Sequence, residues 1–334
     1  MKETIVRAVD LKKWFPVRTG FFSTIFSRKQ LFVRAVDGIS FEIKRGEVFG
    51  LAGESGSGKT TTGRMILRLI EPTGGKIYFE GKDIMTIREK ELKPLRQKMQ
   101  IIFQDPYESL NPKMTVSNIM AEPLNVQGIG SHAETEEKVR NALEDVELIP
   151  AEEFLYRYPH ELSGGQRQRV AVARALILNP EFIVADEPVS MLDVSIRAEV
   201  LNLMLDLVKK FNLSLLYITH DLALARHTCD QLAIMYLGKI METGSTEKIV
   251  YEPLHPYTKA LISAVPVPDP TSQRAGVVIK GEIPSPINPP SGCRFHTRCP
   301  SYIGDVCRTV EPSLIDVGNG HYVACHLYTE KGKK

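Results

Sequence analysis

Eight consecutive residues near position 55 have the types and spacing needed to hold a phosphate group. They read Gly53-Glu54-Ser55-Gly56-Ser57-Gly58-Lys59-Thr60 and match the pattern G-x-x-x-x-G-K-[ST]. Glycines let the backbone curl so that its N–H groups point inward, and a following helix adds partial positive charge. We expect Lys59 to reach the β- and γ-phosphates of a nucleotide, and the Thr60 hydroxyl to hold Mg²⁺. The alternative is a glycine-rich turn that carries a lysine by coincidence.

Two adjacent acids could supply the chemistry that acts on such a phosphate. The apolar run Phe182-Ile183-Val184-Ala185 predicts a buried strand and ends in Asp186 and Glu187. A carboxylate at the strand tip is a hard oxygen ligand, so Asp186 is expected to bind Mg²⁺, through water. Glu187 points the other way along the pleat and is expected to act on the water that attacks the γ-phosphate. Without the glycine-rich loop, the pair could be an ordinary solvated strand end.

The elements around these residues predict an α/β fold with parallel strands. Besides 182–185, short apolar runs at 48–52 and 213–218 indicate buried strands, and the segments 61–67, 166–178 and 195–210 have helical spacing. Of the 334 residues, 43% are hydrophobic and 25% charged, which is typical of a globular protein. The net charge of +2 does not favour a dedicated nucleic-acid binder.

The length and position of the apolar segments indicate how the chain could associate with a membrane. No apolar run approaches the roughly 18–20 residues that span a bilayer, and the charged N-terminus lacks a signal-peptide core, so we expect any attachment to a membrane to depend on partners. The apolar segment Gly20–Phe26 could contact lipid or a membrane partner, or be a hairpin loop that packs its aromatic side chains inward.

The pentapeptide Leu162-Ser163-Gly164-Gly165-Gln166 could by itself be a helix start with Ser163 as N-cap. Together with the glycine-rich loop before it and the Asp-Glu pair after it, it closely resembles the ATP-binding cassette (ABC) ATPases over residues 4–250. The resemblance implies a RecA-like core, an antiparallel β subdomain and a helical subdomain. It also implies that the pentapeptide meets the γ-phosphate of ATP bound to the opposite subunit, where its amides at a positive helix end would be suitable donors.

Further positions match this family. Gln104 matches a glutamine that contacts Mg²⁺ and water and links the site to the membrane partner. His220 matches a histidine that contacts the γ-phosphate. Ser190–Asp193 matches a loop that crosses to the other subunit, although Met191 stands where alanine is common. Phe15, or alternatively Trp14, would stack on adenine. The expected catalytic residues are Glu187, His220 and Gln104, the Mg²⁺ ligands Thr60, Gln104 and Asp186, and the nucleotide-binding residues Phe15, Gly53, Ser55, Gly56, Ser57, Gly58, Lys59, Thr60, Thr61, Gln104, Asp186, Ser163, Gly164, Gly165, Gln166 and Asp193.

The C-terminal part narrows the resemblance to one branch. Segments 255–261, 292–300 and 323–326, with 104–112 inside the cassette, are similar to the oligopeptide and dipeptide importer ATPases, some of whose relatives import nickel or oligosaccharides. We therefore expect an ATPase domain over residues 1–252. Residues 253–334 are expected to form a proline-rich, extended connection followed by a small cysteine-bearing appendage at about 291–328, because closely spaced prolines disfavour helix and central strand.

Four cysteines occupy this C-terminal part: Cys293, Cys299, Cys307 and Cys325. Without a secretory signal, such a cluster suggests metal ligation rather than disulfides. Zinc sites usually begin with a closer pair, whereas four widely spaced thiolates, one followed by Pro300, suit a [4Fe–4S] cluster that acts as a structural staple. The importer resemblance implies the same cluster. Zinc and free thiols remain alternatives, and Cys229 is expected to be a small buried side chain.

The resemblance also implies partners and a mechanism. Two cassettes, identical or paralogous, would face each other head to tail with two ATP molecules between them and drive two transmembrane permease subunits, to which a solute-binding protein delivers cargo. The chain would lie peripherally on the cytoplasmic face of the cell membrane. The competing hypotheses are a soluble ABC ATPase acting on nucleic acid with a zinc module, an exporter cassette, and a binding protein without turnover. The first usually has long coiled coils or two cassettes in one chain, and neither is present.

Overall fold

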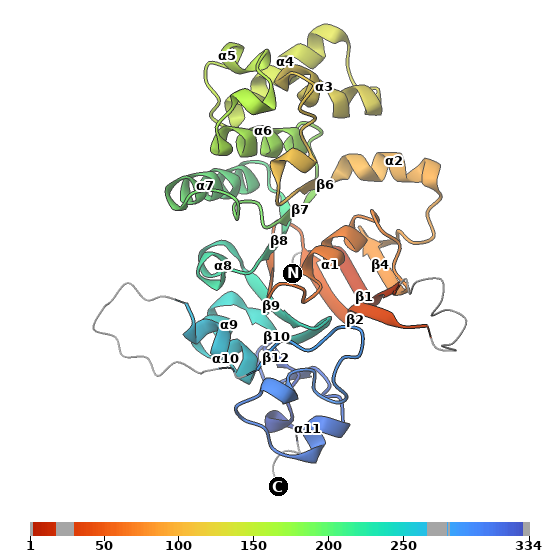
Figure 1. The fold of residues 1–334 in the computed structure, drawn as a ribbon. Coiled ribbons are helices and arrows are strands. Elements are labelled where there is room, and N and C mark those ends of the chain that lie inside the picture. The colour runs from red at the N-terminus through yellow and green to blue at the C-terminus, as the bar shows by residue number, and fades with distance from the viewer. Residues whose placement is uncertain (1–2, 18–29, 266–278, 280, 330–334) are drawn as a thin grey trace, which may run out of the picture. The chain divides into compact units, whose positions relative to one another are not determined.

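A computed structural model describes residues 3–17, 30–265, 279 and 281–329 (Figure 1). The apolar segment Gly20–Phe26 and the prolines at 266, 268 and 270 lie outside the described residues. By their contacts the residues form two units, one of Met1–Ile5, Ile43–Val48 and Asp83–Ile218, the other of Val6–Glu42, Phe49–Lys82 and Thr219–Lys334. They are called unit 1 and unit 2.

Unit 1 contains parallel strands and most of the long helices. Strands β6 (Met99–Ile102), β7 (Phe182–Asp186) and β8 (Ser214–Thr219) pair in parallel, and every residue of β7 and β8 is buried. Continuous burial is typical of parallel strands covered on both faces, which explains their unbroken apolar sequences. The helices are α2 (Glu89–Lys98), α3 (Val116–Gln127), α4 (His132–Asp145), α5 (Glu152–Leu155), α6 (Gly164–Leu176) and α7 (Val194–Lys210). Of these, α3, α4 and α6 pack on one another (Figure 1).

Unit 2 contains most of an antiparallel sheet and part of a mixed one. The first has the order β2 (Phe32–Lys44), β1 (Thr4–Pro16), β4 (Gly74–Phe79) and β5 (Lys82–Asp83), with Val6 opposite Phe79. In the second, β9 (Gln231–Tyr236) runs parallel to β3 (Val48–Ala52) and antiparallel to β10 (Lys239–Ser245). The helices of unit 2 are α1 (Lys59–Ile66), α8 (Leu222–Thr228), α9 (Thr246–Tyr251), α10 (Pro256–Ser263) and α11 (Asp305–Thr309).

The C-terminal segment is built into unit 2. Strand β12 (Tyr322–Val323) pairs antiparallel with β10 and with β11 (Ile315–Asp316). Phe295 and Tyr257 are fully buried in one hydrophobic core with side chains of β9, among them Leu232, Ile234 and Tyr236. Residues after position 252 thus share a core with residues of the expected ATPase domain.

One expectation about this segment is wrong. Residues 256–263 were expected to be extended, yet they form α10. Pro256 stands at the first helical position, where its missing N–H has no intrahelical acceptor to serve. The His255 side chain caps the helix by accepting from the Tyr257 N–H, 3.0 Å away. A proline therefore starts this helix rather than preventing it.

In the described part of the chain, no helix combines the length and the apolar character that crossing a bilayer requires.

Candidate nucleotide-binding site

The glycine-rich loop lies between β3 and α1 in unit 2 and is tightly enclosed. Gly53 and Gly58 have φ values of 150° and 105°. A Cβ at Gly53 would lie 2.2 Å from the Met235 carbonyl oxygen, and one at Gly58 would lie 2.1 Å from the Ala35 carbonyl oxygen. Both positions therefore require glycine, for backbone conformation and for space.

The side chains of the loop are arranged as a phosphate site would need. Lys59 is buried, and its Nζ donates to the carbonyl oxygens of Gly53 and Glu54 at 2.8 and 3.0 Å. The Ser57 hydroxyl is buried and has no hydrogen-bond partner among the described residues. A buried unpartnered hydroxyl is costly, so it points to a ligand that satisfies it. Ser57 and the curled loop thus fit a bound phosphate.

In unit 1, the expected magnesium ligand and base lie at the end of β7. Asp186 is buried, and Glu187 follows at φ 46°, where its N–H donates to the Ile218 carbonyl at 2.9 Å. Gln104 Nε2 donates to Glu187 Oε2 at 3.1 Å. The structure therefore brings together Gln104 and Glu187, which are 83 residues apart in sequence.

The pentapeptide at 162–166 begins α6 as expected. Ser163 is the N-cap, its hydroxyl accepts from the Gln166 N–H at 3.2 Å, and Gln166 Oε1 accepts from the Ser163 N–H at 3.0 Å. A Cβ at Gly165 would lie 2.7 Å from the Ile196 Cγ2 atom of α7. Reciprocal capping and a close helix contact therefore fix this helix start.

Two further expected residues lie at element ends in unit 2. His220 directly follows β8 and is exposed, and Asp221 beside it caps α8 by accepting from the Ala223 and Leu224 N–H groups. Phe15 is 39% exposed near the end of β1. Trp14, in contrast, donates from Nε1 to Asp37 and lies under the Arg34 guanidinium, 4.7 Å from the ring centroid. Of the two aromatic candidates for stacking on adenine, Trp14 is therefore held by contacts with Asp37 and Arg34.

Comparisons with known proteins identify the family. Residues 36–190 match the family model described as ABC transporter, and residues 241–307 match the model described as oligopeptide/dipeptide transporter, C-terminal region. A putative peptide import ATP-binding protein of Brucella ovis is 55% identical over 88% of this chain and 92% of its own. The oligopeptide transport ATP-binding protein AppF of Bacillus subtilis is 50% identical over 98% of both chains. This chain belongs to the ABC transporter ATP-binding proteins.

Solved structures agree with this assignment. An ATP-binding cassette in a dimeric post-hydrolysis state with ADP and Pi matches with a TM-score of 0.62 at 28% identity, over 72% of this chain and 99% of that chain. CbiO1 of Clostridium perfringens matches with a TM-score of 0.63 at 27% identity, over 75% and 92%. The protein is an ABC-type ATPase that uses ATP and Mg²⁺, and the expected α/β cassette fold is confirmed.

The four C-terminal cysteines of this ABC ATPase are neighbours in unit 2. Burial, with smaller contributions from charge on each of the other three cysteines, raises the pKa of the Cys293 thiol to about 12. Burial likewise raises the pKa of Cys325 to about 11, with contributions from Cys299 and Cys307, and Cys299 is affected by Cys307 in turn. Every pair of the four thus interacts electrostatically. Cys229 is partly buried and does not contribute to any of these shifts.

The described residues give no support for the metal site expected at these thiols, whether an iron–sulfur cluster or zinc. Within residues 3–17, 30–265, 279 and 281–329, no three side chains among His, Cys, Asp and Glu converge as ligands of one ion. A zinc ion needs its four ligands on one tetrahedron. In an iron–sulfur cubane each thiolate binds a different iron, so the sulfur atoms need not converge on one point.

Sequence reasoning missed contacts that reach the phosphate loop from the C-terminal segment. The Glu54 N–H donates to the Tyr257 hydroxyl at 3.0 Å, and Arg298 forms an ion pair with the Glu54 carboxylate at 2.8 Å. Tyr257 and Arg298 lie in the segments 255–261 and 292–300, which were noted in the sequence only for their resemblance to the peptide-importer branch. The presence of a tyrosine and an arginine in these branch-specific segments is the signal that could have suggested a contact with the cassette.

Proposed function

We propose that this ABC ATPase is the motor subunit of a peptide importer. Its relatives in Brucella ovis and Bacillus subtilis are named for peptide import and oligopeptide transport, and the C-terminal family model has the same association. The same motor with oligosaccharide or nickel cargo remains the alternative. The observation that carries the ATPase mechanism is the Gln104–Glu187 contact beside the buried Asp186.

In this proposal each residue has one task. The loop around Lys59 and Ser57 binds the β- and γ-phosphates, and Thr60, Gln104 and Asp186 hold Mg²⁺, which neutralises charge on the phosphates. Glu187 accepts the proton of the attacking water. The Gln104 amide supports this role because its hydrogen bond holds the Glu187 carboxylate in one orientation.

The remaining nucleotide contacts follow the same division. His220 contacts the γ-phosphate, and Phe15 stacks on adenine, a role supported by its exposed ring. Ser163, Gly164 and Gly165 bind the γ-phosphate held by the partner cassette, at the positive end of α6. The ordered helix start described above supports this role because its donors are already fixed.

Two cassettes, identical or paralogous, would close on ATP and separate after hydrolysis. ATP binding favours the closed pair because it contacts both subunits, and loss of the bridging phosphate removes that preference. Met191 and Val194 flank Asp193 and are 66% and 81% exposed, so they offer apolar surface to a second cassette. A solved relative was determined as a dimer with ADP and Pi.

The membrane partners would be two permease subunits that receive movement at the segment 104–112. Tyr107 in this segment is an exposed aromatic residue, and its ring lies 4.9 Å from the Arg167 guanidinium of α6. Movement of α6 could therefore pass directly to the surface that meets the permease. The chain would be held at the cytoplasmic face of the membrane by these partners, and a solute-binding protein would supply the cargo.

We further propose that Cys293, Cys299, Cys307 and Cys325 hold a [4Fe–4S] cluster as a structural staple. Their mutual electrostatic interaction supports a shared ligand, because a bound metal cluster would stabilise thiolates that burial otherwise disfavours. Anaerobic protein should show visible absorption and about four irons per chain, and Cys307→Ser should lose both. Stoichiometric zinc without iron would refute the cluster.

The decisive experiment on the motor uses Glu187→Gln. We expect this variant to bind ATP and to form an ATP-dependent cassette dimer, alone or with its paralogue, while hydrolysis falls by about 10²- to 10⁴-fold. Glu137→Gln, a change at an exposed glutamate of α4, is the matched control and should hydrolyse ATP normally. Normal turnover in Glu187→Gln would exclude Glu187 as the base. Transport by liposomes containing the permease, tested with peptides, oligosaccharides and nickel, identifies the cargo.

A further inference from the structure

The phosphate loop contains a carboxylate that needs compensation. Glu54 is the second residue of the loop, and a triphosphate bound there places several negative charges beside it. The Arg298 guanidinium donates hydrogen bonds to both oxygens of this carboxylate, at 2.8 Å from Nη1 to Oε2 and 3.4 Å from Nη2 to Oε1. The arginine side chain is only 10% exposed and the glutamate side chain 23%. The pair is therefore shielded from most of the solvent screening that weakens surface ion pairs.

A second contact holds the same residue through its backbone. The Glu54 N–H donates to the hydroxyl of Tyr257, which is fully buried in α10. Arg298 also donates to the Tyr236 hydroxyl at 3.3 Å. The rings of Tyr236, Tyr257 and Phe295 pack on one another with centroids 4.8 to 5.3 Å apart. Arg298 and Tyr257 thus stand on a rigid aromatic cluster, so they can fix the position of Glu54.

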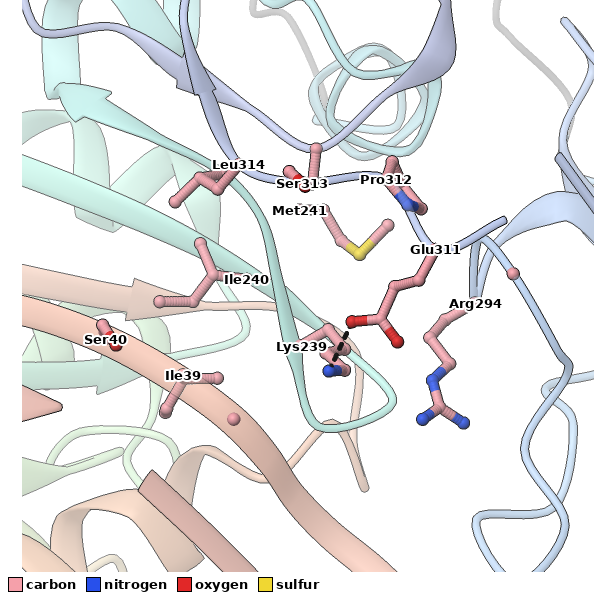
Figure 2. Close-up of a pocket in the computed structure, with 13 residues that line it drawn as sticks. Ile39, Ser40, Lys239, Ile240, Met241, Arg294, Glu311, Pro312, Ser313 and Leu314 are labelled. Atoms are coloured by element: carbon pink, nitrogen blue, oxygen red, sulfur yellow. Dashed lines mark hydrogen bonds and ion pairs between the residues drawn. The ribbon is translucent and has the colours of Figure 1, made fainter. Parts of the chain in front are cut away.

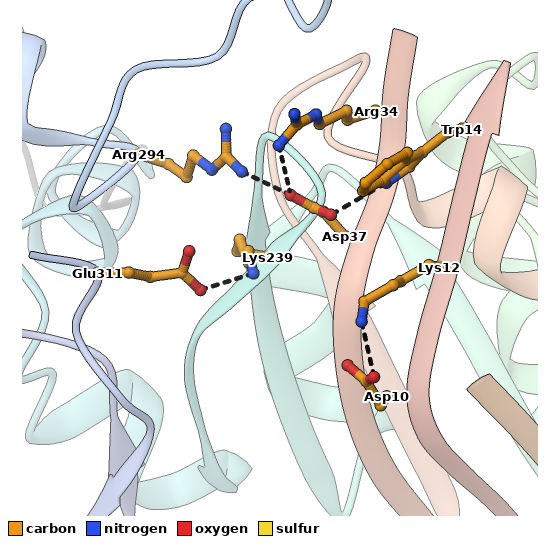
Figure 3. Close-up of polar contacts among 8 residues, drawn as sticks. All are labelled: Asp10, Lys12, Trp14, Arg34, Asp37, Lys239, Arg294 and Glu311. Atoms are coloured by element: carbon orange, nitrogen blue, oxygen red, sulfur yellow. Dashed lines mark hydrogen bonds and ion pairs between the residues drawn. The ribbon is translucent and has the colours of Figure 1, made fainter. Parts of the chain in front are cut away.

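The other end of the Arg298 segment reaches the side of the cassette where adenine is expected. Arg294 is buried, and its Nη2 lies 2.6 Å from Asp37 Oδ2, while Asp37 Oδ1 accepts from Trp14 (Figure 3). Residues 293–299 therefore contact both the phosphate loop and Asp37 of β2, which in turn accepts from Trp14, the neighbour of Phe15 in β1.

A cavity of about 200 Å³ lies beside Arg294 (Figure 2). Lys239 and Glu311, which also line it, pair with each other at 2.6 Å. Since every charged side chain in its lining already has an ion-pair partner, the cavity does not call for a ligand of its own.

We propose that Arg298 is a positioning residue for the phosphate loop. It neutralises Glu54 and fixes the position of this loop residue, and Tyr257 supports it from α10. The affinity for ATP therefore depends on the C-terminal segment, which itself does not touch the nucleotide. This inference rests on the proposed function, because it assigns a control of nucleotide binding to the same ATPase.

The first test is Arg298→Gln in the full-length protein. We expect ATP to bind roughly 10-fold more weakly, which corresponds to about 1.4 kcal/mol. The KM for ATP should rise by a similar factor with kcat nearly unchanged, because Arg298 acts on binding and not on the reacting atoms. Affinity is measured by titration calorimetry in the Glu187→Gln background, and KM and kcat in the wild-type background. Arg308→Gln is the matched control, since Arg308 is an exposed arginine of the same segment that pairs with Asp305.

The second test separates charge compensation from structural damage. In the double variant Glu54→Gln/Arg298→Gln the uncompensated charge is gone, so ATP affinity should return to within about threefold of the parent. A merely structural role for Arg298 predicts no such recovery, and unrecovered affinity would overturn the proposal. Unchanged affinity in Arg298→Gln alone would overturn it too. If the parent protein failed to bind ATP at all, the proposed function itself would fail. Thermal unfolding without nucleotide verifies that each variant is folded.

Discussion

We expect the free energy of unfolding to depend on pH through His255, the residue that caps the start of helix α10. Burial lowers the pKa of this histidine from 6.5 to about 3, with a smaller contribution from Lys259. The Nδ1 atom accepts the Tyr257 N–H, so the proton of the neutral ring is on Nε2, which has no partner among the described residues. Protonation would put hydrogen on the atom that caps α10. The Glu242 carboxylate nearby is bound to the backbone N–H groups of Leu254 and His255 and to His321.

The sign and size of the effect follow from proton linkage. Between pH 6.5 and pH 3 the unfolded chain binds a proton at His255 and the folded chain does not, so stability falls as the pH falls. The unfolded state gains about 0.2 kcal/mol from this proton at pH 7 and about 2 kcal/mol at pH 5. His255 alone should therefore lower the free energy of unfolding by about 2 kcal/mol between these two values.

The assay compares the wild type with His255→Asn by urea unfolding at several pH values. Asparagine can still cap the helix but does not titrate. Taking the difference between the proteins cancels the carboxylates, which titrate in both. The stability difference should shift in favour of the variant by about 2 kcal/mol from pH 7 to pH 5. A difference between wild type and His255→Asn that is constant over this range would refute the reasoning.

Three further changes have defined outcomes. Gly58→Ala forces a Cβ onto the Ala35 carbonyl and should abolish ATP binding, measured by calorimetry, whereas Gly81→Ala, with positive φ but no described atom near the new Cβ, should cost only about 1–2 kcal/mol of stability in urea. Ser163→Ala removes the cap of α6, so it should lower stability by about 1 kcal/mol in urea and weaken the ATP-dependent dimer in sedimentation. Arg169→Met leaves the Val146 carbonyl and Glu147 without this donor and should cost about 1–3 kcal/mol in urea.

Each of these expectations can be contradicted by a specific result. Full ATP affinity in Gly58→Ala would mean that the loop is less tightly enclosed than the distances indicate. An unaffected dimer in Ser163→Ala would remove this residue from the interface. Unchanged stability in Arg169→Met would show that the buried Val146 carbonyl and the exposed Glu147 carboxylate both find other hydrogen-bond donors.

The parts of the fold that the sequence predicted well are those fixed by local pattern. The strand predicted at 48–52 matches β3, and the runs at 182–185 and 213–218 match β7 and β8 within one residue at each end. Buried parallel strands are uniformly apolar, so their limits can be found from hydrophobicity alone. The cap at Ser163 was equally predictable, because capping depends on residues only three positions apart.

Contacts over long sequence distances could not be predicted in this way. Arg298 meets Glu54 across 244 residues, and nothing in the local sequence of either residue identifies its partner. Helix α10 was missed for a different reason, since the density of prolines suggested extended chain whereas the position of Pro256 decided the outcome. The roles expected for Asp186, Glu187 and His220 stay predictions, because they depend on a nucleotide and on residues of both units.

The C-terminal segment has two connections to the cassette, and their chemistry differs. Its apolar connection, Phe295 with Tyr257 and Tyr236, lies in the common core and is insensitive to charge. Its polar connections, Arg298 with Glu54 and Arg294 with Asp37, end on residues beside the expected phosphate and adenine sites. The core contacts can therefore keep the segment attached while the ion pairs respond to the charge of the bound nucleotide. Because coupling is reciprocal, a phosphate loop that depends on the Arg298–Glu54 pair for ATP affinity also requires that bound ATP changes the free energy of that pair by the same amount.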